Sequence, residues 1–197
     1  MNIDGRTKHM LANAVIKLSE TMPLEDVTVT DITNACGMSR NSFYYHFKDK
    51  QDLIWWIYSN FHDTELDLTP KTVQEDCVNI FSFMRKHADF FKQAFKDTRQ
   101  NNFRDAYYGT GCDDYIRMID MHLDENHEHL PKWEKVFLAR YFSLAGTAIT
   151  IEHLEQGTED TDAYVMEIIG MIWKYGLFGV VDKLVEQHKE RSHKGDQ

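Results

Sequence analysis

The chain has 197 residues, of which 42% are hydrophobic and 27% are charged, so it can bury a sizeable core and is too apolar for a disordered tail. It contains only three prolines and ten glycines, and no segment alternates polar and apolar residues between turn dipeptides, which predicts an all-α fold. Three widely spaced cysteines, Cys36, Cys77 and Cys112, indicate reduced thiols in a cytoplasmic protein and give no sign of a disulfide framework or a zinc module. No apolar signal segment opens the chain, and its apolar runs fall short of the ~20 residues that span a bilayer, so no membrane partner is expected.

The net charge of −10 argues at first against a nucleic-acid partner, because neutralisation of phosphates dominates DNA affinity. The charge is unevenly distributed. The first 62 residues carry 6 Lys and Arg against 7 Asp and Glu, which leaves 16 against 25 for the remainder. A monomer should therefore bind DNA weakly, and a dimer should be required.

The N-terminal part predicts two helices in succession. Apolar residues at helical spacing over residues 10–18 predict a first helix that ends near Pro23. Thr28 and Asp31 then have the spacing of a capping box, in which a hydroxyl and a carboxylate satisfy the free amides at a helix start. The second helix is expected to run to about Cys36.

A third helix follows after a glycine turn. Gly37 can adopt the positive φ that other residues adopt at a cost, and Ser39 is a good N-cap. Phe43 and Phe47 lie four residues apart and should form the buried side. This arrangement is typical of a helix-turn-helix, whose second helix enters a DNA groove. The residues left on its other faces are Arg40, Asn41, Tyr44 and Tyr45.

The alternative is a helical hairpin in which Tyr44 and Tyr45 pack against another helix. Exposed aromatic and guanidinium groups favour a binding partner, since large apolar surface normally lies inside. Arg can bind guanine, Asn can bind adenine, and tyrosine rings can contact thymine methyls or phosphates. His46, Lys48 and Lys50 would flank the DNA backbone.

These residues resemble the tetracycline-repressor (TetR/AcrR) family of bacterial transcription regulators, over about the first third of the chain. The run 36–47, followed by 52–57, is most similar to the branch that includes regulators of dihydroxyacetone-kinase operons. Asn41 stands where the family often has glycine. The matching positions are Thr28, Val29, Ile32, Gly37, Ser39, Tyr44, Tyr45, His46, Phe47, Lys48, Lys50 and Leu53.

The resemblance implies a three-helix DNA-binding domain over residues 1–50 and a helical effector-binding and dimerisation domain over residues 51–197. It implies base contacts from Arg40, Asn41 and Tyr44. It also implies phosphate contacts from Thr30, Tyr45, His46 and Lys50.

Beyond the motif the spacing of apolar residues predicts further helices. The expected elements are, in chain order, a helix from Lys50 that carries Phe61, a helix opened by Thr69 and Pro70, a short helix over residues 90–95, a break at 107–111, a helix over 115–123, a polar connector at 124–131, two long helices over 131–156 and 162–175, and a final segment over 177–188.

In the resembling family the last long helices form a four-helix dimer bundle, and this pair is similar. The alternative is that both helix faces pack inside one subunit, which the packing rules do not separate from a dimer. The residues expected at the dimer interface are Phe142, Ala145, Gly146, Ile149, Ile168 and Ile172.

The central region is rich in aromatic and Met side chains, which form cores but also line apolar ligand cavities. Because the family commonly binds small molecules, we expect a pocket for an apolar or aromatic effector. A phosphorylated ligand fits poorly with the acidic remainder of the chain. The expected lining is Trp55, Phe81, Met84, Phe91, Tyr115, Met118, Phe137 and Tyr141.

Catalysis is not expected, because the sequence has no glycine-rich phosphate loop, no nucleophile elbow and no His-Glu-x-x-His motif. His122, His127 and His129 raise the question of a metal site, but they lack an i,i+4 pair on a helix, and a solvated loop is the preferred interpretation. No cofactor is expected.

The sequence thus predicts a cytoplasmic, dimeric, sequence-specific transcription regulator, a repressor, that binds a palindromic DNA operator and is controlled by a small molecule. The alternative is a coregulator or adapter whose signal comes from a protein partner. An enclosed cavity would favour the ligand, and a filled core the protein partner.

Overall fold

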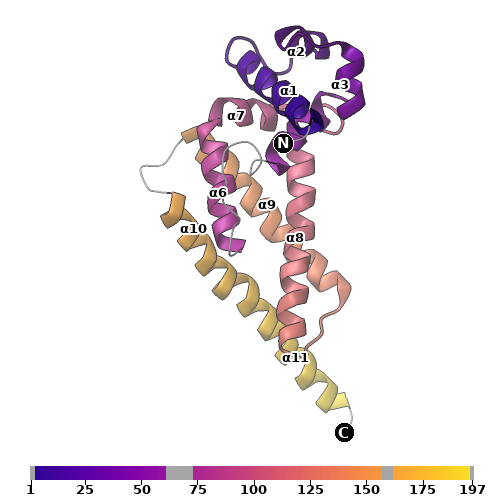
Figure 1. Ribbon diagram of the computed structural model, residues 1–197. Helices are drawn as coiled ribbons and strands as arrows, with labels where there is room; N and C mark the ends of the chain where they lie inside the picture. Colours follow the sequence, from indigo (N-terminus) through magenta and orange to yellow (C-terminus); the bar gives the residue numbers. More distant parts are fainter. Residues whose placement is uncertain (1–2, 61–72, 157–161, 196–197) are drawn as a thin grey trace. The chain divides into compact units, whose positions relative to one another are not determined.

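The computed structural model describes residues 3–60, 73–156 and 162–195, and within these ranges every regular element is helical (Figure 1). The all-α prediction is confirmed. The elements are α1 (Ile3–Ser19), α2 (Val29–Ala35), α3 (Arg40–His46), α4 (Lys50–Ser59), α6 (Val73–Lys86), α7 (Ala88–Lys96), α8 (Phe103–Glu125), α9 (Lys132–Gln156), α10 (Asp162–Met171), the π-helical segment η1 (Ile172–Phe178) and α11 (Gly179–Gly195).

Packing divides the chain into two compact units. The first unit holds helices α1 to α7, α8 as far as Ala106, and α9 from Ile151 onwards. The second unit holds the rest of α8 and α9 together with α10, η1 and α11. The division at residue 50 by function stays a prediction. The expected positions of Phe61 and Pro70 in helices lie outside the described residues.

The core of the first unit is aromatic around α7. Phe103, at the start of α8, lies 4.9 Å from Phe95 and 5.6 Å from Phe91 between ring centroids, and its ring also meets Trp55 of α4 at 6.1 Å. The apolar side chains predicted for the short helix are all buried, which confirms its inward face. Fully buried residues of this unit include Leu11, Val15, Ile32, Phe43, Leu53, Ile54, Ile57, Met84 and Phe91.

Gln93 of α7 holds the segment between α1 and α2. Its side-chain oxygen accepts the backbone N–H of Leu24 at 2.6 Å, and its side-chain nitrogen donates to the carbonyl of Ser19 at 3.0 Å. One amide side chain therefore satisfies two backbone groups that no helix could satisfy.

Asp97 provides a second link, in the turn between α7 and α8. Its carboxylate accepts bonds from the guanidinium of Arg99 and, at 2.6 Å, from the side-chain amide of Gln51 on α4. Arg99 also donates to the carbonyl of Glu25 at 3.3 Å. These bonds join the turn to α4 and to the loop that leads into α2.

Helix α8 runs without interruption from Phe103 to Glu125, so the predicted break at 107–111 is wrong. Glycine normally weakens a helix interior, but here it permits close packing. A Cβ at Gly111 would lie 2.6 Å from Ser143 Oγ on α9, and that hydroxyl donates to the carbonyl of Tyr108 at 2.7 Å. Tertiary contact at Gly111 therefore outweighs the local preference of glycine against the helix interior.

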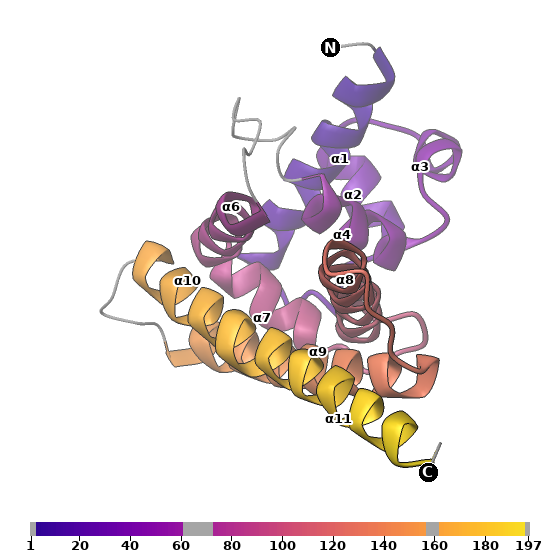
Figure 2. The same cartoon turned by 90° about the horizontal axis from the view of Figure 1, so that it is seen from below.

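The C-terminal helices also form one continuous run, α10–η1–α11, and the predicted gap after Tyr175 is wrong (Figures 1 and 2). Gly176 lies inside η1, where an added Cβ would be 3.6 Å from the Phe142 ring. Trp173 donates its indole N–H to the hydroxyl of Tyr115 at 3.1 Å. The second unit is thus packed around a core whose buried members are Ile119, Leu123, Leu130, Leu138, Leu177, Val181 and Val185.

Helix Tyr164–Arg191 within this run is long and apolar enough to cross a bilayer, with a mean hydropathy of 1.4 and 17% of its most apolar window buried. The apolar runs of the sequence do not predict it. Core and interface helices of soluble proteins meet the same criterion, so the finding does not by itself indicate a membrane protein. It does show how little of this helix is covered within one chain.

The two glycines of α8 provide a matched test of close packing. Both Gly109→Ala and Gly111→Ala gain about 1 kcal/mol of helix propensity, but a Cβ at 109 meets nothing within 4 Å. We expect Gly111→Ala to be about 1–2 kcal/mol less stable than Gly109→Ala in denaturant unfolding, because Ser143 must give up its bond to Tyr108. In a Ser143→Ala background the two variants should be equally stable. Equal stability in the wild-type background would contradict the close contact.

The Asp97 link predicts a pH-dependent stability. The bonds from Arg99 hold the pKa of Asp97 at about 2. A carboxyl with a lowered folded-state pKa stabilises the fold above its unfolded value, near pH 4, and loses this contribution as the pH falls toward 2. Asp97→Asn should therefore cost about 1–2 kcal/mol at neutral pH, and the difference from wild type should shrink between about pH 4 and pH 2.

The control is Asp89→Asn on α7, whose side chain is 87% exposed and whose contact with Lys92 spans 3.5 Å. Exposed pairs contribute little, so this variant should unfold like wild type at each pH. A difference between Asp97→Asn and wild type that stays constant from pH 5 to pH 2 would contradict the assignment.

Candidate nucleic-acid interface

Helices α2 and α3 begin with the local bonds that the sequence predicts. Thr28 Oγ1 accepts the backbone N–H of Asp31 at 3.2 Å, and the Asp31 carboxylate accepts the backbone N–H of Thr28 at 2.9 Å. Bonds from Thr28 lower the pKa of Asp31. Gly37 has φ 65°, and Ser39 Oγ accepts the backbone N–H of Ser42 at 3.1 Å. The capping box, the glycine turn and the second cap are all confirmed.

Helix α3 has one buried and one exposed side. Phe43 and Phe47 are buried, as predicted. Tyr44 is 49% exposed and Tyr45 is 82% exposed, so Tyr45 does not pack against another helix of the described chain. This disfavours the alternative of a plain helical hairpin.

The three residues expected to contact bases share the exposed side of α3. Arg40 and Asn41 are exposed, and the Arg40 guanidinium lies over the Tyr44 ring, 5.9 Å from its centroid. A guanidinium nitrogen of Arg40 also approaches the Tyr44 hydroxyl at 3.4 Å. The two side chains therefore present cationic and aromatic donors side by side at the first turns of the helix.

The residues expected to contact phosphates divide into two groups. Thr30 and Tyr45 are exposed, and His46 is half-buried between Tyr45 and Phe47, with ring centroids at 4.9 and 6.4 Å. Lys48, which follows α3, is exposed. These side chains can reach a partner.

The Lys50 side chain cannot reach a partner, so the phosphate contact expected from Lys50 is wrong. Its side chain is buried, and its ammonium donates to the carbonyls of Leu24, of Val27 at 2.6 Å and of Glu25 at 3.3 Å. An ammonium has three donors, and all three are used. Burial, with the nearby Arg99 acting in the same direction, lowers the pKa of Lys50 to about 8. Lys50 holds the loop before α2 in place.

The eight residues expected to line an effector pocket are divided between the two units. Trp55, Phe81, Met84 and Phe91 belong to the first unit and the other four to the second. Phe81, Met84 and Phe91 are core residues, whereas Phe137 and Tyr141 are 64% and 63% exposed. The remaining residues of that set, Trp55, Tyr115 and Met118, are half-buried, the last two against the core of the second unit.

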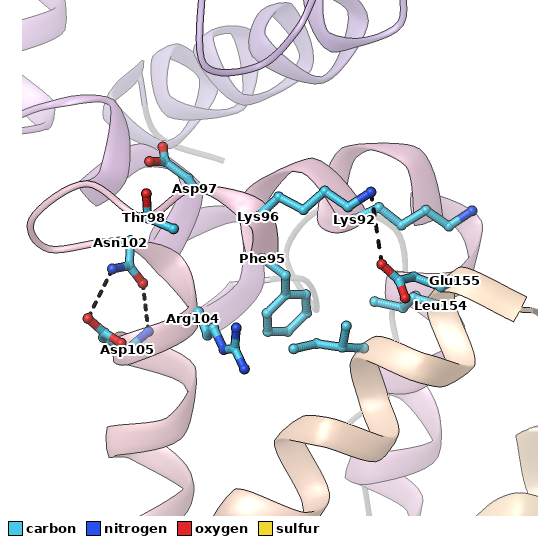
Figure 3. Close-up of a pocket in the computed structure, with 11 residues that line it drawn as sticks. Lys92, Phe95, Lys96, Asp97, Thr98, Asn102, Arg104, Asp105, Leu154 and Glu155 are labelled. Atoms are coloured by element: carbon cyan, nitrogen blue, oxygen red, sulfur yellow. Dashed lines mark hydrogen bonds and ion pairs between the residues drawn. The ribbon is translucent and has the colours of Figure 1, made fainter.

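A different pocket, of about 620 Å³, lies within the first unit (Figure 3). It is formed by the end of α7, the turn to α8, the start of α8 and the end of α9. None of the eight expected residues lines it. The lining residues are Lys92, Phe95, Lys96, Asp97, Thr98, Asn102, Arg104, Asp105, Ile151, Leu154 and Glu155.

Most of the expected dimer residues are uncovered in the single chain. Ile149, Ile168 and Ile172 are 50%, 39% and 45% exposed, and Ala145 is exposed. Phe142 is an exception, because it packs against the core of the second unit, and Gly146 is half-buried beside the Tyr115 hydroxyl.

Further large apolar residues that sequence analysis did not assign to an interface are exposed next to these positions. Trp133, Phe137 and Tyr141 recur every four residues along α9, a spacing that could have identified them. We call the exposed large apolar residues of α9 and of α10–η1 together the apolar stripes. On α9 they comprise Trp133, Phe137, Tyr141, Leu144 and Ile149, and on α10–η1 they comprise Tyr164, Ile168, Met171, Ile172 and Tyr175, all 39% to 70% exposed.

The three histidines considered for a metal site do not converge. His122 contacts Asp182 at 2.7 Å and stacks on Phe178 with ring centroids 4.6 Å apart. His127 and His129 are exposed in the connector, where His127 has φ 56°. Among the residues that the structure describes, no three His, Cys, Asp or Glu side chains are placed to hold a metal ion.

Two family models match the chain. The model described as bacterial regulatory proteins, tetR family, matches residues 16–54, which include the whole of α2, α3 and the turn between them. The model described as transcriptional regulator C-terminal region matches residues 71–175, more than half of the chain.

Two curated relatives are similar. The HTH-type dhaKLM operon transcriptional activator DhaS of Lactococcus lactis subsp. lactis is 23% identical over 153 residues, 77% of this chain and 81% of that protein. The HTH-type transcriptional regulator TtgR of Pseudomonas putida is 32% identical over 59 residues, 30% of this chain and 28% of that protein.

Among solved structures, the dihydroxyacetone kinase operon activator DhaS has a similar fold, with a TM-score of 0.56 at 20% identity over 91% of this chain and 96% of that one. The two likenesses to DhaS support the similarity to dihydroxyacetone-kinase operon regulators that the motif indicated. The chain belongs to the TetR family of bacterial transcriptional regulators.

Proposed function

We propose that this protein is a dimeric, sequence-specific DNA-binding regulator that inserts α3 into the major groove of a palindromic operator. The observation that carries the proposal is the exposed side of α3, where Arg40, Asn41 and Tyr44 stand uncovered on a helix fixed from behind by Phe43 and Phe47. Arg and Asn have the donor and acceptor geometry that distinguishes base edges in the major groove. Thr30, Tyr45, His46 and Lys48 would fix the helix against phosphates.

A dimer is required by the charge of the DNA-binding part. Residues 1–62 carry 6 Lys and Arg against 7 Asp and Glu, too little positive charge for one copy to bind tightly. The apolar stripes supply a surface for a second copy, since large uncovered apolar areas on a helix pair are typical of subunit interfaces. Two copies of α3 set ~34 to 36 Å apart, or a multiple of it, would read both halves of a palindrome.

Control by a small molecule is the proposal that we develop, because the first unit contains a pocket of about 620 Å³ that is partly open to solvent. Pockets of this size hold drug-sized ligands. The expected repressor role stays a prediction, and DhaS is named as an activator. A reporter gene under the operator, assayed with and without the protein, shows whether the protein represses or activates transcription. We further propose a cytoplasmic protein without catalytic activity, as its family relatives are regulators.

Base readout is tested on a site selected by the purified protein from random duplex DNA. Arg40→Ala or Tyr44→Ala should weaken binding to the selected site by ~1–3 kcal/mol and leave binding to random DNA nearly unchanged. Lys48→Ala should weaken both equally and reduce the salt dependence by about one unit of slope. Equal losses on both DNAs for Arg40→Ala and Tyr44→Ala would contradict direct readout.

The dimer is tested by Ile168→Arg. Ile168 is 39% exposed in a single chain, so the subunit should still fold, whereas burial of an unpaired Arg in the interface should cost more than about 3 kcal/mol. Sedimentation should show a dimeric wild type and a monomeric variant with weak operator binding. The control is Glu125→Arg, exposed at the end of α8, which should remain dimeric. A monomeric wild type at micromolar concentration, or a fully dimeric Ile168→Arg, would contradict the model.

A further inference from the structure

The pocket of the first unit combines an apolar floor with a charged rim (Figure 3). Phe95 and Leu154 are buried and Ile151 is half-buried, and all three side chains line the space. Arg104 extends from the start of α8 toward Phe95, and Lys96 reaches Glu155 on the other side (Figure 3). Such a site can hold a ligand with an apolar body and a charged end.

Two of the three rim carboxylates, Asp97 and Asp105, already have partners, whereas Glu155 has only the weak contact with Lys96 at 3.9 Å. Asp97 accepts bonds from Arg99 and Gln51, and Asp105 accepts the Asn102 side-chain amide at 2.9 Å as part of the cap of α8. These carboxylates are therefore occupied in holding the turn between α7 and α8.

Two cations of the rim, Arg104 and Lys96, have weak partners or none among the described residues. Arg104 has no hydrogen-bond or ion-pair partner among the residues that the structure describes. Lys96 meets Glu155 only at 3.9 Å, with side chains 70% and 49% exposed, a contact of little energetic weight. The first turn of the 23-residue helix α8 contributes Arg104 and Asp105 to the lining, and the backbone N–H of Asp105 donates to the Asn102 side chain at 2.9 Å. Arg104 is therefore the rim cation with which a bound anion can pair without displacing a carboxylate of the chain.

We propose that this pocket binds a small organic carboxylate, with the acid group at Arg104 and the apolar part on Phe95, Ile151 and Leu154, and that the occupied pocket changes operator binding. This ligand class adds an acid group to the apolar or aromatic effector expected from sequence. The second part of the inference rests on the proposed DNA-binding function.

The route from the pocket to the DNA-binding helices is short. Asp97 and Lys96 line the pocket, and Asp97 is bonded to Gln51 of α4 and to Arg99. Arg99 in turn donates to Glu25 in the loop that leads into α2. A carboxylate bound at Arg104 lies next to the turn between α7 and α8, and this turn holds the loop before α2. The ligand would therefore have different affinities for the DNA-competent and the free conformations.

Binding is tested by calorimetric titration of the full chain with octanoate and with octanamide, which has the same apolar tail and no charge. Octanoate should bind at least about tenfold more tightly than octanamide. Arg104→Gln should weaken octanoate binding at least about tenfold. The control is Arg117→Gln in the second unit, where the guanidinium is 72% exposed and pairs with Asp114, and it should bind like wild type. Equal affinity for the two compounds, or undiminished binding by Arg104→Gln, overturns the carboxylate site.

Coupling is tested by measuring affinity for the selected DNA site with and without saturating octanoate. Wild type should change its affinity at least about fivefold, and Arg104→Gln should show no change. Gln51→Leu, outside the lining, leaves Asp97 paired with Arg99, so it should still bind octanoate and should reduce the change in DNA affinity. An unchanged DNA affinity in octanoate-bound wild type overturns the coupling, and an undiminished change in Gln51→Leu overturns the route. Failure to select any DNA site would refute the proposed function and leave the octanoate titration as an independent test of the pocket.

Discussion

The bonds between the Lys50 ammonium and the loop before α2 are the constraint on which the first unit depends. A buried charge is costly unless its donors are satisfied, and the carbonyls of Leu24, Glu25 and Val27 supply the three acceptors. In return the ammonium fixes a loop whose backbone groups have no helical partners. Gln93 and Arg99 hold the same loop from α7 and the following turn. Polar contacts from three later elements therefore fix the loop that leads into the helix-turn-helix, in addition to the apolar packing of α1, α2 and α3 on one another.

Weak charge and exposed apolar surface have a common explanation in this protein. A DNA-binding part that is nearly neutral cannot rely on phosphate attraction, so its affinity must come from several contacts made at once. The second unit leaves Tyr141 and Tyr175 63% and 70% exposed, which is unfavourable in a monomer. Both observations are accounted for if two chains bind together. The geometry of the pair then matters more for recognition than the total charge of either chain.

Local rules predicted the parts of the site that depend on neighbouring residues. The cap at Thr28 and the turn at Gly37 involve groups within a few positions of each other, so the sequence alone determines them. Lys50 matched the family motif but points inward, because only the fold decides whether a long side chain meets solvent or carbonyls. By local preference Gly111 predicts a helix break, but in the fold it allows close contact between α8 and a residue distant in sequence, Ser143. Aromatic content likewise could not separate a filled core around Phe91 from a ligand site.

Helices α8 and α9 each contribute residues to both compact units, with changes of unit after Ala106 and before Ile151. The first unit is therefore discontinuous in sequence, and a polypeptide cut after α7 would lack Phe103 and Leu154, both buried in it. Hybrid regulators made by joining the N-terminal half of one family member to the C-terminal half of another would leave those two positions to the foreign sequence. DNA specificity in such proteins is better exchanged by grafting only the exposed side of α3. The side chains on that surface are not part of the core that Phe103 and Leu154 complete.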